Sequence, residues 1–178
     1  QVVEPGNYWR LDQHEFREQW RELPMHDDGR DGDAAAGDGT WSVQVPPEVQ
    51  MHRRLVRYQV HATDGKGARV LVPYPDDGCP NFAWFVYGGV PDWTGAPRPG
   101  RSPTNTFSSA LLQTLPVYHL IAREQDVERC QWSQDSAGVR FEGALVYDGV
   151  VYDHIPFHIR GKGSTYVSGK NKWGFNFH

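Results

Sequence analysis

Arginine, lysine, serine and glycine gather near the carboxyl end of the sequence in a pattern that could hold a phosphate. Glycines let backbone N–H groups approach an anion, a serine hydroxyl adds a hydrogen bond, and lysine ammonium groups supply point charges. The pattern is not a Walker A motif, because no Gly-Lys-Ser/Thr precedes a helix. On spacing alone, a plain glycine-containing hairpin loop is the favoured interpretation. The residues of the candidate phosphate site are Arg160, Gly161, Gly163, Ser164, Lys170 and Lys172.

The charge pattern around this candidate site is consistent with an anionic ligand. Residues 154–178 contain no carboxylate but several lysines and an arginine. Such a segment attracts anions, although a solvated strand face explains the same composition. For Arg160 the structural alternative is a salt bridge to a nearby acid, either Asp153 or Asp148.

A second group of charged residues lies in an acidic loop, residues 26–39. Aspartates are the ligands that Ca²⁺ prefers, but an EF-hand loop also needs a glutamate at its twelfth position, and none stands there. We therefore favour a solvated linker that is the most protease-sensitive stretch of the chain unless a cation or partner orders it. The aspartates of the acidic loop are Asp27, Asp28, Asp31, Asp33 and Asp38.

Other kinds of chemistry find little support. The eight histidines show no metal-binding pattern, because His154 and His158 on one strand would be about 13 Å apart, so we predict no metal ligands. No Gly-x-Ser-x-Gly nucleophile motif is present. Cys79 and Cys130 form either one bridge or two unrelated thiols. The net charge of -4 argues against nucleic-acid binding.

Composition predicts a mostly β (α+β) chain of antiparallel hairpins with a few short helices. Only 38% of the 178 residues are hydrophobic, and 19 glycines and 13 prolines favour turns and short strands. No apolar run is long enough to span a membrane. Asp64-Gly65 and Asp148-Gly149 are expected hairpin turns. Strands are expected over 41–45, 55–60, 68–72, 82–87, 117–122, 139–147, 150–160 and 170–177, and helices within 12–23, 105–113 and 123–130.

Several of these elements carry more detailed expectations. Asp12 with Glu15 predicts a helix cap, and Phe82 to Tyr87 alternates as a strand buried on both faces. Pro156 places its strand at a sheet edge or a bulge. The many aromatic side chains favour core packing over a carbohydrate-binding platform.

The chain divides into three expected regions. Residues 1–45 form an N-terminal helix and an acidic flexible linker. Residues 46–75 form a partial, sandwich-like accessory β segment, because so few strands cannot make a sandwich alone. Residues 76–178 form an incomplete β-lobe that holds the candidate phosphate site.

The last thirty residues resemble the signature of the CotH family, which comprises spore-coat-type and secreted proteins with an atypical protein-kinase fold. The family pattern is a strand ending in Arg-Gly-Asn-x-Ser, then a short insert, then Lys-x-Ser-aromatic at the start of the next strand. Lys162 departs from the usual Asn, and Lys172 from the usual Ser. The matching residues are Arg160, Gly161, Ser164 and Lys170.

The resemblance implies a nucleotide-binding role. The Arg-Gly loop would cover the ATP phosphates, Lys170 would pair with them, and Lys172 would be the second choice. It also implies Mg²⁺, whose ligands and catalytic carboxylate lie on a downstream lobe in that family. The chain would then be the N-terminal fragment of a secreted bacterial kinase-like protein, inactive by itself, with a protein as the candidate substrate.

A non-catalytic extracellular β-rich binding or assembly module is the alternative, with the kinase-like signature retained only as ancestry. Either interpretation implies a partner, namely the remainder of the same polypeptide or another subunit. We expect it to cover the apolar strands over 82–86 or 173–177. A secreted or cell-surface location is expected in both cases.

Overall fold

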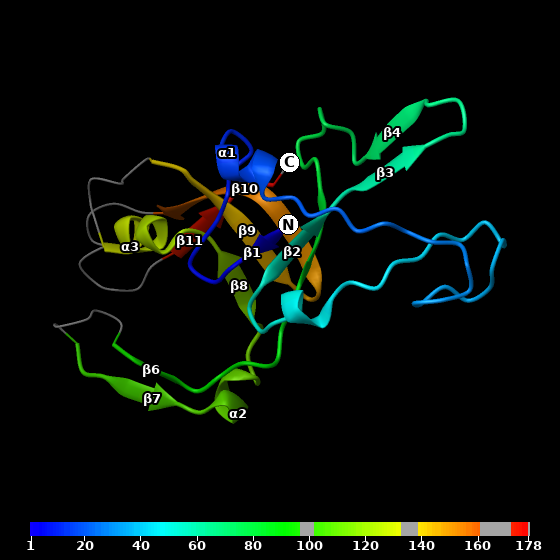
Figure 1. The fold of residues 1–178 in the computed structure, drawn as a ribbon. Coiled ribbons are helices and arrows are strands. Elements are labelled where there is room, and N and C mark those ends of the chain that lie inside the picture. Colours follow the sequence, from blue (N-terminus) through cyan, green and yellow to red (C-terminus); the bar gives the residue numbers. More distant parts are fainter. Residues whose placement is uncertain (97–101, 133–138, 161–171, 178) are drawn as a thin grey trace.

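The computed structural model describes residues 1–96, 102–132, 139–160 and 172–177 (Figure 1). Within these ranges the chain is mostly β, with antiparallel sheets and few short helices, as the composition predicts. The strands are β1 (Val2–Val3), β2 (Leu55–Tyr58), β3 (Val60–Thr63), β4 (Arg69–Val72), β5 (Phe82–Phe85), β6 (Trp93–Gly95), β7 (Asn105–Phe107), β8 (Tyr118–Ile121), β9 (Phe141–Tyr147), β10 (Val150–Arg160) and β11 (Lys172–Phe175). The helices are α1 (His14–Glu18), α2 (Ser109–Leu112) and α3 (Glu124–Trp132), with a 3-10 turn at Pro47–Val49.

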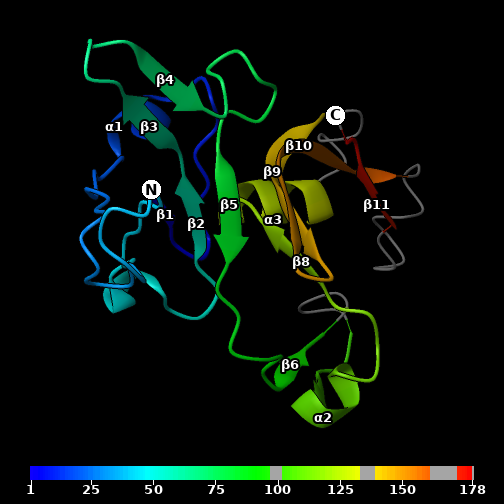
Figure 2. The same cartoon turned by 90° about the vertical axis from the view of Figure 1, so that its right-hand side faces the viewer.

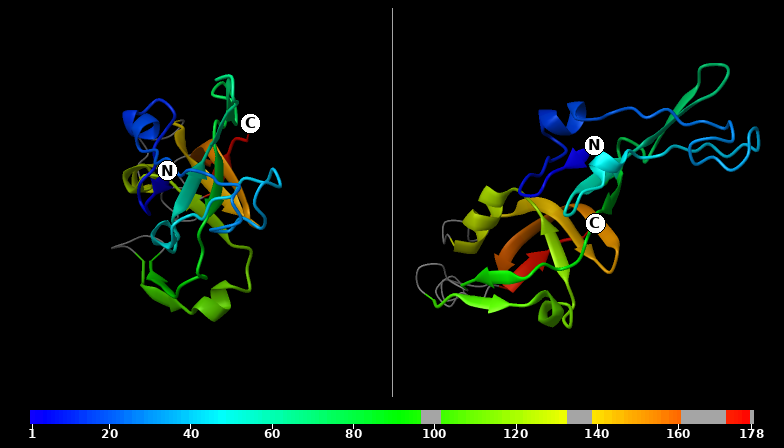
Figure 3. Two further views of the ribbon diagram at one scale, coloured as in Figure 1. Left: turned by 45° about the vertical axis from the view of Figure 1, so that its right-hand side comes forward. Right: turned by 60° about the horizontal axis from the view of Figure 1, so that its bottom comes forward.

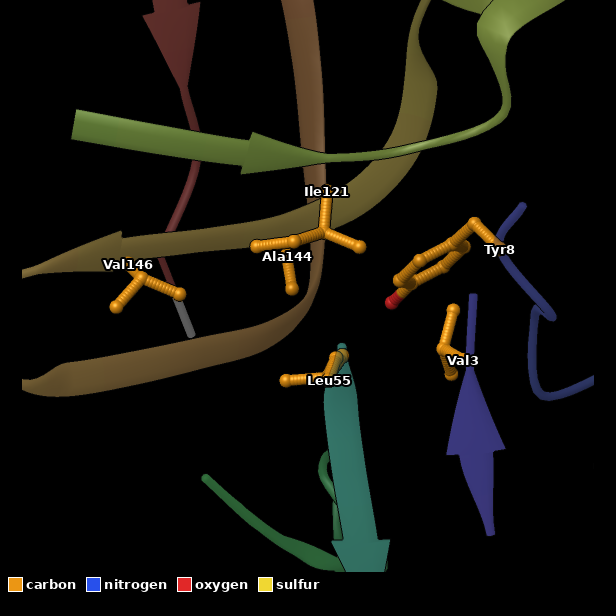
Figure 4. Packing of buried hydrophobic residues seen from close by; sticks show 6 residues of the cluster. All are labelled: Val3, Tyr8, Leu55, Ile121, Ala144 and Val146. Carbon is orange, nitrogen blue, oxygen red and sulfur yellow. The ribbon is translucent and has the colours of Figure 1, made fainter. Parts of the chain in front are cut away.

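Two sheets form the body of the molecule. One has the strand order β1-β2-β5 and the other β11-β10-β9-β8. The first hydrophobic cluster joins them: Val3 and Leu55 come from the three-stranded sheet, and Ile121, Ala144 and Val146 come from the four-stranded sheet (Figure 4). The ring of Tyr8, from the segment after β1, closes this cluster.

The four-stranded sheet is covered by helix α3 on its other face. Phe141 and Ala144 lie an odd number of residues apart on β9, so their side chains point to opposite faces. Phe141 joins a second cluster with Phe157, Ile159 and Cys130 of α3. Trp173 and Phe175 of β11 pack against this second cluster, as the alternation of the last strand predicts.

Three segments extend away from the body (Figures 1 and 2). One is the β3–β4 hairpin and another is the β6–β7 hairpin, each a separate two-stranded sheet. The third is the acidic loop, whose ends are tied by an isolated bridge between His26 and Ser42. Figure 3 shows the β3–β4 hairpin and the acidic loop projecting from the same side.

Both predicted Asp-Gly turns are present. Asp64 accepts hydrogen bonds from the backbone N–H groups of Lys66 and Ala68 and so closes the β3–β4 turn. Asp148 and Gly149 both have positive φ, the conformation that a two-residue hairpin needs, and they join β9 to β10. Local turn chemistry fixed both hairpins.

The N-terminal elements differ from the sequence prediction. Helix α1 begins at His14 after an N-cap residue, Gln13, whose side chain makes no cap bond, and the predicted cap residue Asp12 pairs with Arg10 instead. The predicted strand over 41–45 reduces to the single bridge at Ser42. The Trp41 side chain is exposed there and finds no core to enter.

Two further regions differ from the prediction, one in its bounds and the other in its burial. Residues 105–107 are strand β7, and only then does α2 begin, with the Ser108 hydroxyl capping it by accepting from the N–H of Leu111. Strand β5 was expected to be buried on both faces, but it is the last strand of its sheet and leaves Phe82 exposed. Strand β5 alternates as predicted, but its outer face is left partly open, as the exposed Phe82 shows.

Pro156 lies in β10, which has a neighbour on each side, so it is not on an edge strand. The register of β10 against β9 shifts between Tyr152 and Ile155, which places a bulge just before Pro156, the second of the two predicted settings. Cys79 and Cys130 are free thiols, so the alternative of two unrelated cysteines holds. Among the described residues, none of the helices is both long and apolar enough to cross a membrane.

Candidate functional site

Two residues of the candidate phosphate site are described, and the sheet brings them together. Arg160 ends β10, Lys172 begins β11, and the two pair directly across the antiparallel ladder. Both side chains are exposed, which leaves two cationic groups side by side at one end of the sheet. The other predicted residues, Gly161, Gly163, Ser164 and Lys170, lie outside the described residues.

The side chain of Arg160 lies over a glycine. A Cβ placed on Gly174 would meet Cγ of Arg160 and Cε1 of His158 at 2.9 and 2.7 Å, so the glycine makes room for both side chains. The expected salt bridge from Arg160 to Asp153 is wrong. Asp153 is buried and its carboxylate is bound by Arg57, whereas Arg160 stands at the exposed end of the strand.

A buried polar network, which we define as Tyr8, Arg57, Asn81, Asp153 and His154, lies where the two sheets meet. The Arg57 guanidinium donates two hydrogen bonds to Asp153, from Nε to Oδ2 at 2.7 Å and from the second nitrogen to Oδ1 at 3.0 Å. The Tyr8 hydroxyl donates to Asp153 Oδ1 at 2.7 Å, and Asn81 donates to Oδ2 at 3.0 Å. All five residues are less than 9% exposed.

His154 holds its place in the network through an uncommon backbone conformation. Its φ is +54°, at the bulge of β10, which turns its ring toward the Asn81 side chain. A ring nitrogen, Nε2, lies 2.9 Å from Asn81 Oδ1, and the backbone N–H donates to Asp153 Oδ1. The bulge therefore lets two successive polar residues of one strand enter the same buried network.

The charges of this network stabilise one another. Burial by itself would raise the pKa of Asp153, but the Arg57 guanidinium outweighs it and holds that pKa at about 2. Burial also acts to lower the pKa of Arg57, and the Asp153 carboxylate raises it above its ordinary value. Burial raises the pKa of Tyr8 well above its usual range, and the Asp153 charge adds to this effect.

The hydrogen bonds and burial of this network indicate a structural role rather than a catalytic one. Asp153 accepts three hydrogen bonds on Oδ1 and two on Oδ2, so its carboxylate is already saturated by protein donors. A catalytic acid or base needs to reach a substrate proton, and these side chains are closed off from solvent. Arg57 was not among the predicted site residues, although strand alternation places it on the same core-facing side as Leu55.

A cluster of aromatic rings, two exposed and one half-buried, lies on the outer side of the three-stranded sheet, and we call it the aromatic face. It consists of Tyr58 of β2 with Phe82 and Trp84 of β5. Their rings contact one another, with centroids 5.1 Å apart for Tyr58–Phe82 and 5.5 Å for Tyr58–Trp84. The inner side of the same strands carries Leu55 and Phe85, which pack on the first core cluster. Tyr58 is 42% and Phe82 40% exposed.

The β3–β4 hairpin presents a second apolar surface directly after Tyr58. Val60 pairs across the ladder with Val72, and Ala62 pairs with Val70, so the four side chains share one face. Val70 and Val72 are exposed. We call these four residues the hairpin face. Soluble monomers seldom leave such surfaces open without an interaction role.

The architecture defines a β-rich class of protein in which two small sheets pack through a shared core, with hairpin arms. A family model adds a more particular likeness: residues 18–73 are similar to the second Ig-like domain of conditioned medium factor. The match covers less than half of the chain and spans α1's last residue, the acidic loop, β2 and the β3–β4 hairpin. No curated protein matches the chain, and no solved structure matches it either.

The match supports an Ig-like segment but gives no support to the CotH resemblance. The Ig-like match overlaps the expected accessory β segment, residues 46–75, and extends further toward the N-terminus. The CotH family is not among the family matches, so the kinase-like likeness rests on the sequence motif alone. Ig-like modules serve many unrelated functions, so any function has to be argued from surfaces and sites.

Proposed function

We propose that this chain is a non-catalytic, β-rich binding or assembly module of a secreted or cell-surface protein. Its likeness to an Ig-like domain over residues 18–73 supports the class. The buried polar network supports it as well, because its hydrogen bonds and ion pair join the two sheets. The observation that carries the proposal is the aromatic face, in which Tyr58 and Phe82 are exposed and contact the half-buried Trp84 or each other.

The partner is an apolar protein surface, supplied by the remainder of the same polypeptide or by another subunit. Aromatic rings give large contact area at low cost in side-chain entropy, which is why tyrosine, phenylalanine and tryptophan concentrate at the centres of interfaces. The rings of the aromatic face lie tilted against each other, at 32° and 53°, rather than as one flat platform. This geometry favours a protein partner over a sugar ring stacked on a planar surface.

The experiment compares self-association and dye binding of the chain with those of a double variant, Tyr58→Ser with Phe82→Ser. Sedimentation velocity over a range of concentrations reports association, and the fluorescence of an apolar dye reports the accessible patch. We expect the parent chain to associate or to bind dye strongly, and the double variant to lose most of both. Leu115→Ser is the control, because Leu115 is an exposed apolar residue that belongs to neither strand of the aromatic face.

Two results would contradict the proposal. One is a parent chain that sediments as a monomer at all concentrations and binds no more dye than the double variant. The other is an equal loss in the Leu115→Ser control. Specific capture of an oligosaccharide that depends on Trp84 would replace the protein partner with a carbohydrate.

A second candidate function is ATP binding, as the CotH resemblance implies, and one observation favours it. Arg160 and Lys172 lie side by side and exposed, and two adjacent cations suit a phosphate. When bound, ATP would supply a phosphoryl group, and the resemblance implies that Mg²⁺ would accompany it. In this chain Arg160 and Lys172 would bind and orient the phosphates, together with Lys170 of the motif.

The test is an ATP titration of the longest natural polypeptide that contains this chain, with Mg²⁺ present. Lys170→Ala should weaken ATP binding roughly ten- to hundred-fold, because it removes one charge-assisted contact, and Lys172→Ala should weaken it less. Lys66→Ala, in the exposed β3–β4 turn, is the control. Equal ATP affinity in the parent protein and in Lys170→Ala would contradict ATP binding at the candidate phosphate site.

A further inference from the structure

The acidic loop brings three of its aspartates to one point. Asp27, Asp33 and Asp38 each offer a carboxylate oxygen, and these three oxygens all lie within 4.8 Å of one another. We propose that this cluster is a calcium site. The proposal is independent of the aromatic face and of the candidate phosphate site.

The separation of the oxygens fits one shared ion. Ca²⁺ binds oxygen at about 2.3–2.6 Å, so two ligands of the same ion are at most about 5 Å apart. Three oxygens within 4.8 Å of one another can therefore all reach one Ca²⁺ with little movement. Waters or backbone carbonyl groups of the loop would complete a shell of six to eight oxygens.

A buried oxygen without a partner is the second observation. Asp33 is only 7% exposed, although every other residue of the acidic loop except the half-buried Asp27 is exposed. One of its oxygens, Oδ2, accepts a short hydrogen bond from the Gly29 N–H at 2.6 Å. The other, Oδ1, is buried and has no hydrogen-bond partner. Burying an unpaired carboxylate oxygen is costly, and a bound cation would remove that cost.

The loop already has the rigidity that a cation site requires. The Asp27 carboxylate accepts from the backbone N–H groups of Gly37, Asp38 and Gly39, so it ties the end of the loop to its beginning. The bridge between His26 and Ser42 closes the base of the loop. These contacts hold Asp27 and Asp38 near Asp33 before any ion arrives, which lowers the entropy cost of binding.

The donor set selects the kind of ion. Each of the three residues offers a carboxylate oxygen, whereas zinc and copper sites draw on imidazole or thiolate. Three carboxylates suit a hard divalent cation. Mg²⁺ needs shorter, octahedral bonds and keeps most of its waters, so the larger Ca²⁺ fits a site made of several protein oxygens better. Asp28, Asp31 and Arg30 are the other charged side chains of this loop, and all three are exposed.

The test begins with a calorimetric titration of CaCl₂ into the chelator-treated chain. We expect saturable binding with Kd at or below about 1 mM, the range of extracellular calcium modules. Asp33→Asn should weaken binding at least roughly ten-fold, because it removes a charged ligand from the site. Asn keeps an oxygen for the Gly29 N–H, so the chain should melt in EDTA at least as high as the parent. Asp38→Asn, at an exposed position, is a second variant should Asp33→Asn fail to fold.

Asp31→Asn is the matched control. It removes the same charge from the same loop, lies outside the cluster, and stands at a positive φ that asparagine tolerates well. A second readout is tryptic cleavage after Arg30, which Ca²⁺ should slow in the parent chain and in Asp31→Asn but not in Asp33→Asn. The proposal is overturned by an absence of binding up to about 10 mM Ca²⁺. It is overturned equally by the same weakening in Asp31→Asn, or by Mg²⁺ binding as tightly as Ca²⁺.

Discussion

Arg57 of β2 and Asp153 of β10 are 96 residues apart in sequence and form a bidentate ion pair in the core, with Nε 2.7 Å from Oδ2. Each belongs to a different sheet, so the pair ties the three-stranded sheet to the four-stranded sheet. The rings of Tyr8 and Phe16 lie over the guanidinium, with their centroids 4.8 and 5.4 Å from its carbon. The pair therefore links the two sheets in addition to the first hydrophobic cluster.

Removing one partner of this pair should be strongly destabilising. Asp153→Leu leaves the Arg57 charge buried without its counter-charge, and Arg57→Met does the same to Asp153. We expect each single variant to lose about 3–5 kcal/mol of unfolding free energy. The double variant Arg57→Met with Asp153→Leu should recover a large part of this loss, since it leaves no charge buried. Urea unfolding followed by tryptophan fluorescence measures all three, and strictly additive losses would show that the two residues are not coupled.

The same pair should make the fold sensitive to acid. The pKa of Asp153 is about 2 in the folded chain against 3.8 as its ordinary value, so folding favours the ionised form. The contribution of Asp153 is therefore complete above about pH 5 and is lost as the pH falls through 2, by roughly 2 kcal/mol. The urea midpoints of the parent and of Asp153→Asn should converge as the pH falls below 4. Curves that stay parallel down to pH 2 would contradict the assignment.

A glycine in the middle of β9 should resist substitution. A Cβ on Gly143 would lie 2.7 Å from the carbonyl oxygen of Ile121 and 3.1 Å from the Phe157 ring, so alanine would push β8 and β9 apart. We expect Gly143→Ala to cost about 1–3 kcal/mol in urea unfolding. Gly65→Ala is the control, because a Cβ at that turn position has nothing within 4 Å. Equal stability of the two variants would count against the close packing of β8 on β9.

The two cysteines should titrate as free thiols. Cys79 and Cys130 are unbridged, and burial raises the pKa of each thiol. We expect slow reaction with a disulfide reagent in the native chain, slower for the buried Cys130 than for the half-buried Cys79. In denaturant without reductant, both thiols should react fully. Recovery of no thiol under those conditions would mean that the chain carries a disulfide.

The local features of the fold could be read from the sequence because they depend on residues close together in the chain. Asp64-Gly65 and Asp148-Gly149 specify their turns through backbone conformation and a short side-chain bond. Alternation in residues 139–160 places the long β9–β10 hairpin within two residues of its observed bounds. The antiparallel, β-rich class followed from the same local signals.

Other features depended on contacts that no local pattern contains. The strand predicted over 41–45 has the right alternation but no neighbouring strand to pair with beyond one bridge, so it does not form. Strand β5 was expected to be covered on both faces, yet only the tertiary packing decides which face meets a second layer. The ion-pair partner of Asp153 also depended on tertiary packing. Arg160 is near Asp153 in sequence, but Arg57 is the arginine that contacts it.

Local sequence patterns were enough to predict the hairpins, the β-rich class, the acidic loop and the basic end of a strand. Long-range packing brings Arg57 and Asp153 together in the core, leaves Tyr58 and Phe82 exposed together, and buries Asp33 beside two other aspartates. The physical reason is that turns and alternation arise from bonded geometry over a few residues. Burial and charge pairing are set instead by which distant segments the whole chain packs together.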